Sequence, residues 1–189
     1  MPVNKIKILD CSLRDGGYYN NWDFDIDFVN DYLETMSKSS VNFVEIGFRF
    51  LPKDKFLGPY AYSTDSFLSK INLPEGLEYG VMINAKEYIE NNIRVEDLFL
   101  KREDSKISLV RLAINFDSAL GSKKLAASIK DLGYIVGLNL MQSNGKEDNE
   151  YQEIAAEIAS WNCVDVLYFA DSLGNMYPED VSRITNSLK

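Results

Sequence analysis

Six short apolar runs rich in β-branched residues recur along the chain, and helical patterns separate them. The runs predict strands at residues 7–13, 43–48, 79–83, 109–114, 135–141 and 164–170. The intervening patterns predict helices at residues 26–36, 64–70, 85–90, 118–132, 151–161 and 178–188. Strands that alternate with helices pair in parallel and are covered on both faces. The chain is therefore predicted to be an α/β protein.

The length of the chain leaves two architectures open. A TIM-type parallel (β/α) barrel typically needs about 250 residues, whereas this chain has 189, so it would hold six of the eight βα units. An open doubly wound parallel sheet fits six strands as well. No shift of composition marks a boundary, so we expect a single domain over residues 1–189, incomplete at its C-terminus. Residues 16–24 and 49–63 are predicted to be long loops after strands, where α/β proteins place their sites.

The composition narrows the choice of partners and chemistry. Acidic residues outnumber basic ones by 29 to 20, which argues against nucleic acids and membranes as partners and favours a small molecule. No run approaches the roughly 20 apolar residues of a membrane span, so we expect a cytoplasmic protein. The sequence has no histidine, which excludes Ser-His-Asp and Cys-His catalysis and the commonest zinc ligand. Cys11 and Cys163 lie far apart in apolar stretches and are expected to be buried thiols.

Charged residues accompany the first two predicted strands. Arg14 and Asp15 lie where the first strand ends, either as site residues or as the opening of an ordinary turn at Gly16 and Gly17. Glu45 interrupts an apolar strand, and a buried carboxylate needs a cation, a metal or several hydrogen-bond donors. We expect Arg14 to be its partner, in a structural ion pair or in a catalytic site.

Further polar residues accompany the later strands. Asp171 and Ser172 follow the sixth strand, and Asp171 is expected to face the ligand-binding edge rather than to cap the next helix. Arg111 and Asn139 add polar groups to the fourth and fifth strands. Because parallel strands end at one edge of a sheet, these groups are predicted to form one polar pocket with those of the first two strands. Asp15, Glu45 and Asp171 are candidate oxygen ligands for Mg²⁺ or Mn²⁺.

Three motifs resemble those of a known superfamily. Residues 9–17, Leu-Asp-Cys-Ser-Leu-Arg-Asp-Gly-Gly, resemble the strand-one signature of the DRE-TIM metallolyases, the HMG-CoA lyase-like and 4-hydroxy-2-oxovalerate aldolase-like enzymes. Val-Glu-Ile-Gly at 44–47 and Asp-Ser-Leu-Gly at 171–174 resemble the strand-two and strand-six motifs of the same superfamily.

The resemblance implies a (β/α)₈ barrel with a divalent metal, Mg²⁺ or Mn²⁺, that holds a 2-oxo acid or an acyl-CoA partner. Asp15 matches a metal ligand, and Arg14 matches the residue that stabilises an enolate. Glu45 matches a residue that orients this arginine, and Asp171 matches one near the metal with an acid–base role. Such enzymes also take ligands from a His-X-His pair on strand seven, and many use a histidine base where this chain has Tyr18 and Tyr19.

These observations favour the catalytic domain of a metal-dependent carbon–carbon lyase or aldolase that cleaves a 4-hydroxy-2-oxo acid to pyruvate and an aldehyde. Arg111, Asn139 and Ser172 are the predicted substrate-binding residues. Residues 1–189 alone are expected to be inactive and to self-associate through open barrel edges or helices. Two alternatives stay open: an acyl-CoA lyase or condensing enzyme of the same superfamily, and a non-catalytic binding or regulatory module derived from a partial barrel.

Overall fold

A computed structural model describes residues 6–188. The strands are β1 (Leu9–Asp10), β2 (Phe43–Phe48), β3 (Glu78–Asn84), β4 (Leu109–Asn115), β5 (Ile135–Met141) and β6 (Val166–Phe169). The α-helices are α1 (Ser12–Asn20), α2 (Ile26–Ser37), α3 (Asp65–Leu68), α4 (Ala85–Glu90), α5 (Lys123–Asp131), α6 (Asp148–Ser160) and α7 (Pro178–Ser187). Four 3₁₀ helices are η1 (Pro59–Ala61), η2 (Val95–Asp97), η3 (Arg102–Asp104) and η4 (Phe116–Ser122) among these residues.

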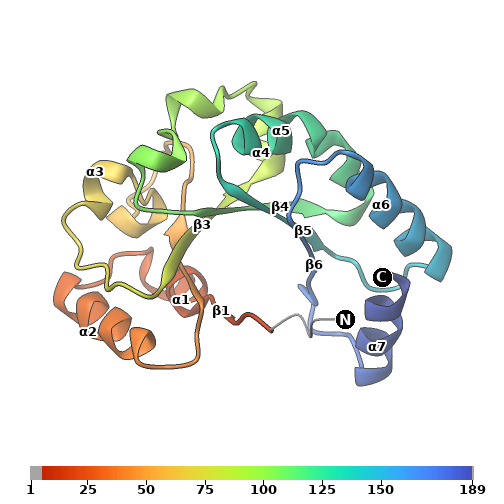
Figure 1. Cartoon of the computed structure of the whole chain (residues 1–189), viewed down its shortest axis with the longest axis horizontal. Coiled ribbons are helices and arrows are strands. Elements are labelled where there is room, and N and C mark those ends of the chain that lie inside the picture. The colour runs from red at the N-terminus through yellow and green to blue at the C-terminus, as the bar shows by residue number, and fades with distance from the viewer. Residues whose placement is uncertain (1–5, 189) are drawn as a thin grey trace. The chain divides into compact units, whose positions relative to one another are not determined.

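The described strands form one sheet whose order follows the chain, β1-β2-β3-β4-β5-β6 (Figure 1). β1 pairs with β2, β2 with β3, and β5 with β6, all in parallel. A doubly wound sheet reverses its strand order at a switch point, and this sheet does not. The predicted TIM-type (β/α) arrangement with six units is therefore confirmed, and the doubly wound alternative is excluded.

The contacts divide the chain into two compact units, which are described separately. The first unit comprises residues 6–83 and 96–110, and the second comprises residues 84–95 and 111–188. The prediction of a single domain over residues 1–189 stays a prediction. Among the described residues, no helix has the length and apolar character required to cross a membrane.

In the first unit, α2 packs against the sheet through an amphipathic face. The helix begins after Asp25, whose carboxylate accepts a hydrogen bond from the backbone N–H of Phe28 at 3.1 Å. This is the capping expected of an aspartate at that position. Val29 and Leu33, one turn apart, are fully buried, as is Ile46 on β2. The spacing of these apolar residues accounts for the helix predicted at residues 26–36.

In the second unit, β5 is covered on both faces. Val136, Leu138 and Leu140 are fully buried on one face, and Asn139 on the other face is 6% exposed. The preceding helix α5 ends just before Gly133, whose φ of +92° is a conformation that glycine adopts at little cost. This burial explains why the strand is predominantly apolar along its whole length.

The largest difference from the sequence prediction concerns residues 11–24. The strand predicted at residues 7–13 is only Leu9–Asp10, and the motif predicted as a strand end and loop forms helix α1 instead. The carboxylate of Asp10 starts this helix by accepting hydrogen bonds from the backbone N–H and the hydroxyl of Ser12, both at 3.0 Å. Gly17 is needed for packing rather than for a turn, because a Cβ there would lie 1.9 Å from the indole of Trp22.

The other predicted elements are all present, some with the predicted bounds and others with shifted ends. The helix predicted at 118–132 starts as the 3₁₀ turn η4 and becomes α-helical only at Lys123. The helix predicted at 151–161 begins earlier, at Asp148, because Glu147 and Glu150 form a capping box. The helix predicted at 64–70 shortens to α3, and the strand predicted at 164–170 shortens to β6.

Candidate active site

Arg14 and Asp15 occupy successive positions in the first turn of α1, directly after β1. Helix α1 packs on β2 and η1, which brings the N-terminal turn of the helix close to Glu45. The side chains of Arg14 and Asp15 therefore project from a helix rather than from an extended strand. The first strand thus ends before this pair, at Asp10, rather than at residue 13 as predicted.

Arg14 forms ion pairs with two carboxylates. Its Nε donates to Oε2 of Glu45 at 2.7 Å, and its Nη1 contacts Oδ1 of Asp15. The side chain of Glu45 is fully buried, that of Arg14 is 14% exposed, and that of Asp15 is 61% exposed. The pairing of Arg14 with Glu45 predicted from the sequence is present.

The electrostatics keep Arg14 charged. Burial alone would lower the pKa of its guanidinium, but the charge of Glu45 and the hydrogen bond to it outweigh this effect, and Asp15 adds to them. The pKa of Arg14 is therefore raised above its ordinary value. The result is a permanent cation, held in a fixed orientation beside a solvent-exposed carboxylate.

Two aromatic side chains, Trp22 and Phe48, also contact Arg14. The indole N–H of Trp22 donates to the carbonyl oxygen of Arg14 at 2.9 Å. The guanidinium of Arg14 lies 5.7 Å from the ring centre of Phe48, and the rings of Trp22 and Phe48 meet edge to face at 5.5 Å. A cation over an aromatic face is attracted to it. Main chain and side chain of Arg14 are therefore both restrained.

Tyr18 lies one turn after Arg14, on the same helical face, and its ring is 63% exposed. Burial raises the pKa of its phenol, and the nearby Arg14 only partly offsets this effect. A tyrosine with a raised pKa is neutral near pH 7 and is a poor general base. The structure thus gives no support for Tyr18 as a substitute for a histidine base.

The two buried substrate-binding candidates of the second unit bind each other. Nη2 of Arg111, on β4, donates to Oδ1 of Asn139, on β5, at 3.2 Å, and both side chains are 6% exposed. The guanidinium of Arg111 also lies 4.5 Å from the ring centre of Tyr168 on β6. The absence of a side chain at Gly137 makes room for Arg111, whose Cγ would lie 2.9 Å from a Cβ there.

Asp171 and Ser172 organise the loop after β6. The carboxylate of Asp171 accepts hydrogen bonds from the backbone N–H groups of Asn175 at 2.9 Å and Met176 at 3.0 Å. These bonds lower the pKa of Asp171. The hydroxyl of Ser172 accepts from the backbone N–H of Gln142 at 2.9 Å, which joins this loop to the end of β5.

This loop encloses a hollow of about 50 Å³, lined by Gln142, Asn144, Ala170, Asp171, Ser172, Leu173 and Asn175. Asp171 does not cap α7, because Tyr177 occupies the N-cap position. A carboxylate with a lowered pKa holds its proton weakly, so Asp171 is better suited to shaping the loop than to donating a proton near pH 7.

The described residues fit a divalent metal only in part. Residues 6–188 contain no group of three or more acidic or cysteine side chains placed to hold an ion. Glu45 is engaged by Arg14, which leaves Asp15 as the exposed carboxylate of this cluster. Mg²⁺ is commonly bound through one or two carboxylates plus waters. Asp15 can therefore supply one ligand, but the described residues do not complete a site.

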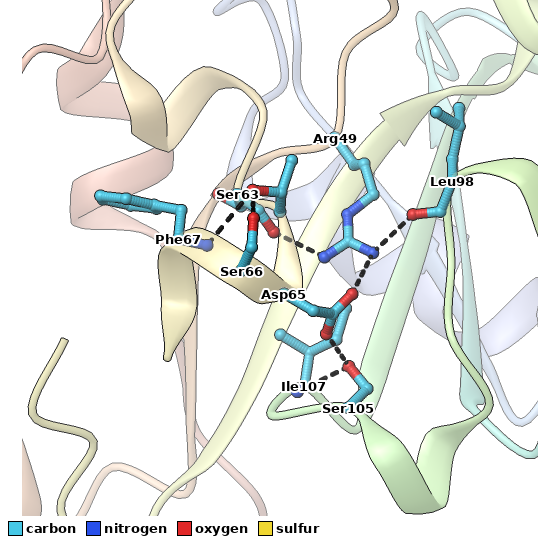
Figure 2. A network of polar contacts seen from close by, with 9 residues as sticks. Arg49, Ser63, Asp65, Ser66, Phe67, Leu98, Ser105 and Ile107 are labelled. Carbon is cyan, nitrogen blue, oxygen red and sulfur yellow. Dashed lines mark hydrogen bonds and ion pairs between the residues drawn. The ribbon is translucent and has the colours of Figure 1, made fainter. Parts of the chain in front are cut away.

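Sequence reasoning missed Arg49, which follows β2 and is 2% exposed. Figure 2 shows its guanidinium among Ser63, Asp65 and Leu98. It also missed the role of Trp22 behind Arg14. The only sequence signal for either residue is position, since Arg49 directly follows a buried strand and Trp22 follows the glycine pair.

Comparisons with known proteins agree with the resemblance shown by the three sequence motifs at residues 9–17, 44–47 and 171–174. No family model matches the chain. A 4-hydroxy-2-oxovalerate aldolase from Geobacillus genomosp. 3 is 24% identical over 190 aligned residues, which cover 100% of this chain and 55% of the aldolase. The N-terminal domain of a candidate aldolase from Bacteroides vulgatus has a TM-score of 0.86 and 28% identity over 97% of this chain and 60% of its own.

These relatives support the resemblance of the three motifs to the DRE-TIM metallolyase superfamily. HMG-CoA lyase from Bacillus subtilis has the same fold, with a TM-score of 0.70 and 13% identity, and the match covers 100% of this chain and 65% of the lyase. The carboxyl transferase domain of Rhizobium etli pyruvate carboxylase matches with a TM-score of 0.65 and 10% identity, over 98% of this chain and 34% of its own. The chain thus spans 55 to 65% of the length of the first three relatives.

Proposed function

We propose that this chain is the larger part of the catalytic domain of a metal-dependent aldolase that cleaves a 4-hydroxy-2-oxo acid to pyruvate and an aldehyde. The observation that carries the proposal is the Arg14–Glu45–Asp15 cluster. A guanidinium is fixed by one buried and one exposed carboxylate. The aldolase from Geobacillus supports this choice of substrate over an acyl-CoA.

The chemistry requires a fixed positive charge at an oxygen that becomes anionic. In aldol cleavage a base takes the proton of the 4-hydroxyl group, the bond between C3 and C4 breaks, the C4 fragment leaves as the aldehyde, and the electron pair of the broken bond moves into an enolate of pyruvate. Among residues 6–188, no acceptor occupies Nη2 of Arg14, so this nitrogen is available to donate to the enolate oxygen. A donor held in place before the reaction lowers the barrier without reorganisation cost.

The other candidates have supporting roles in this proposal. Glu45 orients Arg14, and Asp15 contributes one ligand to Mg²⁺ or Mn²⁺, which would act as a Lewis acid on the 2-oxo acid. Arg111, Asn139 and Ser172 are proposed to bind substrate, and Asp171 shapes the loop that carries Ser172.

The test is pyruvate release from 4-hydroxy-2-oxopentanoate by the complete gene product in the presence of Mn²⁺, coupled to lactate dehydrogenase. Arg14→Lys is expected to lower kcat by about 100-fold or more, because the single ammonium of lysine cannot reproduce the planar, spatially separated donors of the guanidinium. Arg102→Lys is the control, since Arg102 is an exposed arginine of the same unit. Unchanged turnover in the Arg14 variant would remove Arg14 from the mechanism.

Residues 1–189 alone are proposed to be inactive and cytoplasmic. Both cysteines are free thiols, as is usual in a reducing compartment. The expected result for this chain is weak Mn²⁺ binding, reduced by Asp15→Asn, with no measurable pyruvate release. Rapid release by residues 1–189 would show that no further residues are needed.

A further inference from the structure

Arg49 is the centre of a buried polar network in the first unit (Figure 2). Its Nη1 donates to Oδ2 of Asp65 at 3.0 Å and to the carbonyl of Leu98 at 2.9 Å, and its Nη2 donates to the carbonyl of Ser63 at 2.5 Å. The guanidinium lies 4.4 Å from the ring centre of Phe99. Three segments distant in sequence are thus joined by one side chain.

The network continues beyond Arg49. Oδ1 of Asp65 accepts from the hydroxyl of Ser105 at 2.5 Å. The charge of a buried arginine requires fixed acceptors nearby, and here both terminal nitrogens of Arg49 have them. The fork geometry of the guanidinium meets acceptors in several directions, which the single ammonium of lysine cannot reproduce. Arg49 is therefore placed to fix the ends of the segment that starts directly after it.

That segment, residues 50–62, packs against the end of α1, and we call it the brace. Its ends are held together by the backbone N–H of Phe50, which donates to the carbonyl of Ala61 at 3.1 Å. The N–H of Gly58 donates to the carbonyl of Asn21 at 2.7 Å. A Cβ at Gly58 would lie 2.3 Å from the carbonyl oxygen of Trp22. The backbone of the brace is therefore in close contact with the backbone that follows the end of α1.

Phe50 connects the brace to the arginine of the candidate active site. Its ring stacks on Phe48 at 4.2 Å between centres and meets the edge of Trp22 at 5.3 Å. Trp22 in turn donates its indole N–H to the carbonyl of Arg14. A continuous set of contacts therefore leads from Arg49 through Phe50 and Trp22 to the backbone that carries Arg14.

We propose that Arg49 is a positioning residue. It acts through the brace and Trp22 to hold Arg14 in the orientation in which its Nε donates to Glu45. That Arg14 then acts on an enolate rests on the proposed function. The positioning itself does not depend on it. Arg49 lies at one end of this set of contacts and the backbone of Arg14 at the other, so substitution of Arg49 is expected to act on Arg14 through Phe50 and Trp22.

The test is hydrogen exchange of two side-chain N–H groups, followed by ¹H–¹⁵N NMR without substrate. The Trp22 indole N–H reports the contact with the Arg14 carbonyl, and the Arg14 Nε–H reports the bond to Glu45. Arg49→Lys is expected to speed both exchange rates at least tenfold. The indole N–H of Trp161, which donates to Glu157 at 2.9 Å in the second unit, is the internal control and should not change.

A second variant removes the contacts through which the brace reaches Trp22. Phe50→Leu removes the stacking on Phe48 and Trp22 but leaves the contacts of Arg49 intact, so it should speed the same two exchange rates. It also decides the question if Arg49→Lys does not fold. Arg183→Lys, at an arginine of the second unit that pairs with Asp148 at 2.6 Å, is the control and is expected to leave both rates at the wild-type value.

The proposal is overturned if Arg14 and Trp22 exchange at wild-type rates in Phe50→Leu, or in a folded Arg49→Lys protein. Those results would assign Arg49 to local stability alone. Because no substrate enters the measurement, a protein that shows the exchange effect but releases no pyruvate would contradict the proposed function and leave the positioning role intact.

Discussion

Nε of Arg14 donates to Oε2 of Glu45 at 2.7 Å, and the carboxylate that receives it is fully buried. Burial of a charge is tolerated only when an opposite charge satisfies it, so each of these residues requires the other in the folded protein. The pair joins α1 to β2 and fixes the direction of the guanidinium. Stability and the proposed catalysis therefore depend on the same contact.

Glu45→Gln should destabilise the protein strongly, because it leaves the guanidinium of Arg14 partly buried with Asp15 as its remaining carboxylate. We expect a loss of about 3 kcal/mol in the free energy of unfolding, the usual cost of breaking a buried pair. Urea unfolding measures it. The control is Glu34→Gln, because Glu34 pairs with Lys38 at 3.0 Å on an exposed helix face and should contribute less than about 0.5 kcal/mol. Equal effects of the two variants would contradict the buried pair.

The two glycines of α1 should respond in opposite ways to alanine. Gly17→Ala would place a Cβ 1.9 Å from the Trp22 indole, so we expect a loss of about 2 kcal/mol and a red-shifted Trp22 emission. At Gly16 the nearest atom would be 3.6 Å away, in Phe24, and the helix gains up to about 1 kcal/mol from alanine. If Gly17→Ala were as stable as Gly16→Ala, the packing of Trp22 on α1 would be wrong.

The positions of the strands were predictable from the sequence, whereas the conformation of the first motif was not. β2 and β5 are predominantly apolar runs, and their predicted and observed bounds coincide. α1 contains two glycines, which lower helix propensity, and its stability depends on packing by Trp22, a tertiary contact. The partnership of Glu45 with Arg14 was predictable, because a charge inside an apolar strand requires a partner.

The burial of Arg49 could not be predicted in the same way. Its acceptors are two carbonyl oxygens and Asp65, and the carbonyls belong to Ser63 and Leu98, whose side chains give no sign of the contact. The same holds for Asp171, whose carboxylate is occupied by backbone N–H groups. Backbone partners have no sequence signature, so residues bound by them can be placed only from the structure.

Self-association through β6 is expected, since this strand is last in the order of the described sheet and its Val166 is 37% exposed. An edge strand with apolar side chains invites pairing with another chain. Sedimentation velocity of residues 1–189 should show a mass that rises with concentration. Val166→Lys should suppress the rise if the edge mediates it, whereas Val181→Lys, on the exposed face of α7, should suppress it if the helices do. A monomer at all concentrations would contradict both routes.

Asp171→Asn should alter the pH dependence of stability. Hydrogen bonds from the backbone N–H groups of Asn175 and Met176 lower the pKa of Asp171 in the folded protein below its unfolded value of about 3.9. A group with a lowered folded pKa stabilises the protein above its unfolded pKa, and this contribution is lost as the pH falls through the folded pKa.

The wild-type protein should therefore be more stable than Asp171→Asn at pH 7, and the difference should shrink below about pH 4. Urea unfolding of both proteins between pH 3 and pH 7 measures this difference, and Asp117→Asn is a control because it alters an exposed aspartate of the same unit that pairs with Lys146. A difference that stays constant down to pH 3 would show that the charge of Asp171 does not hold the loop.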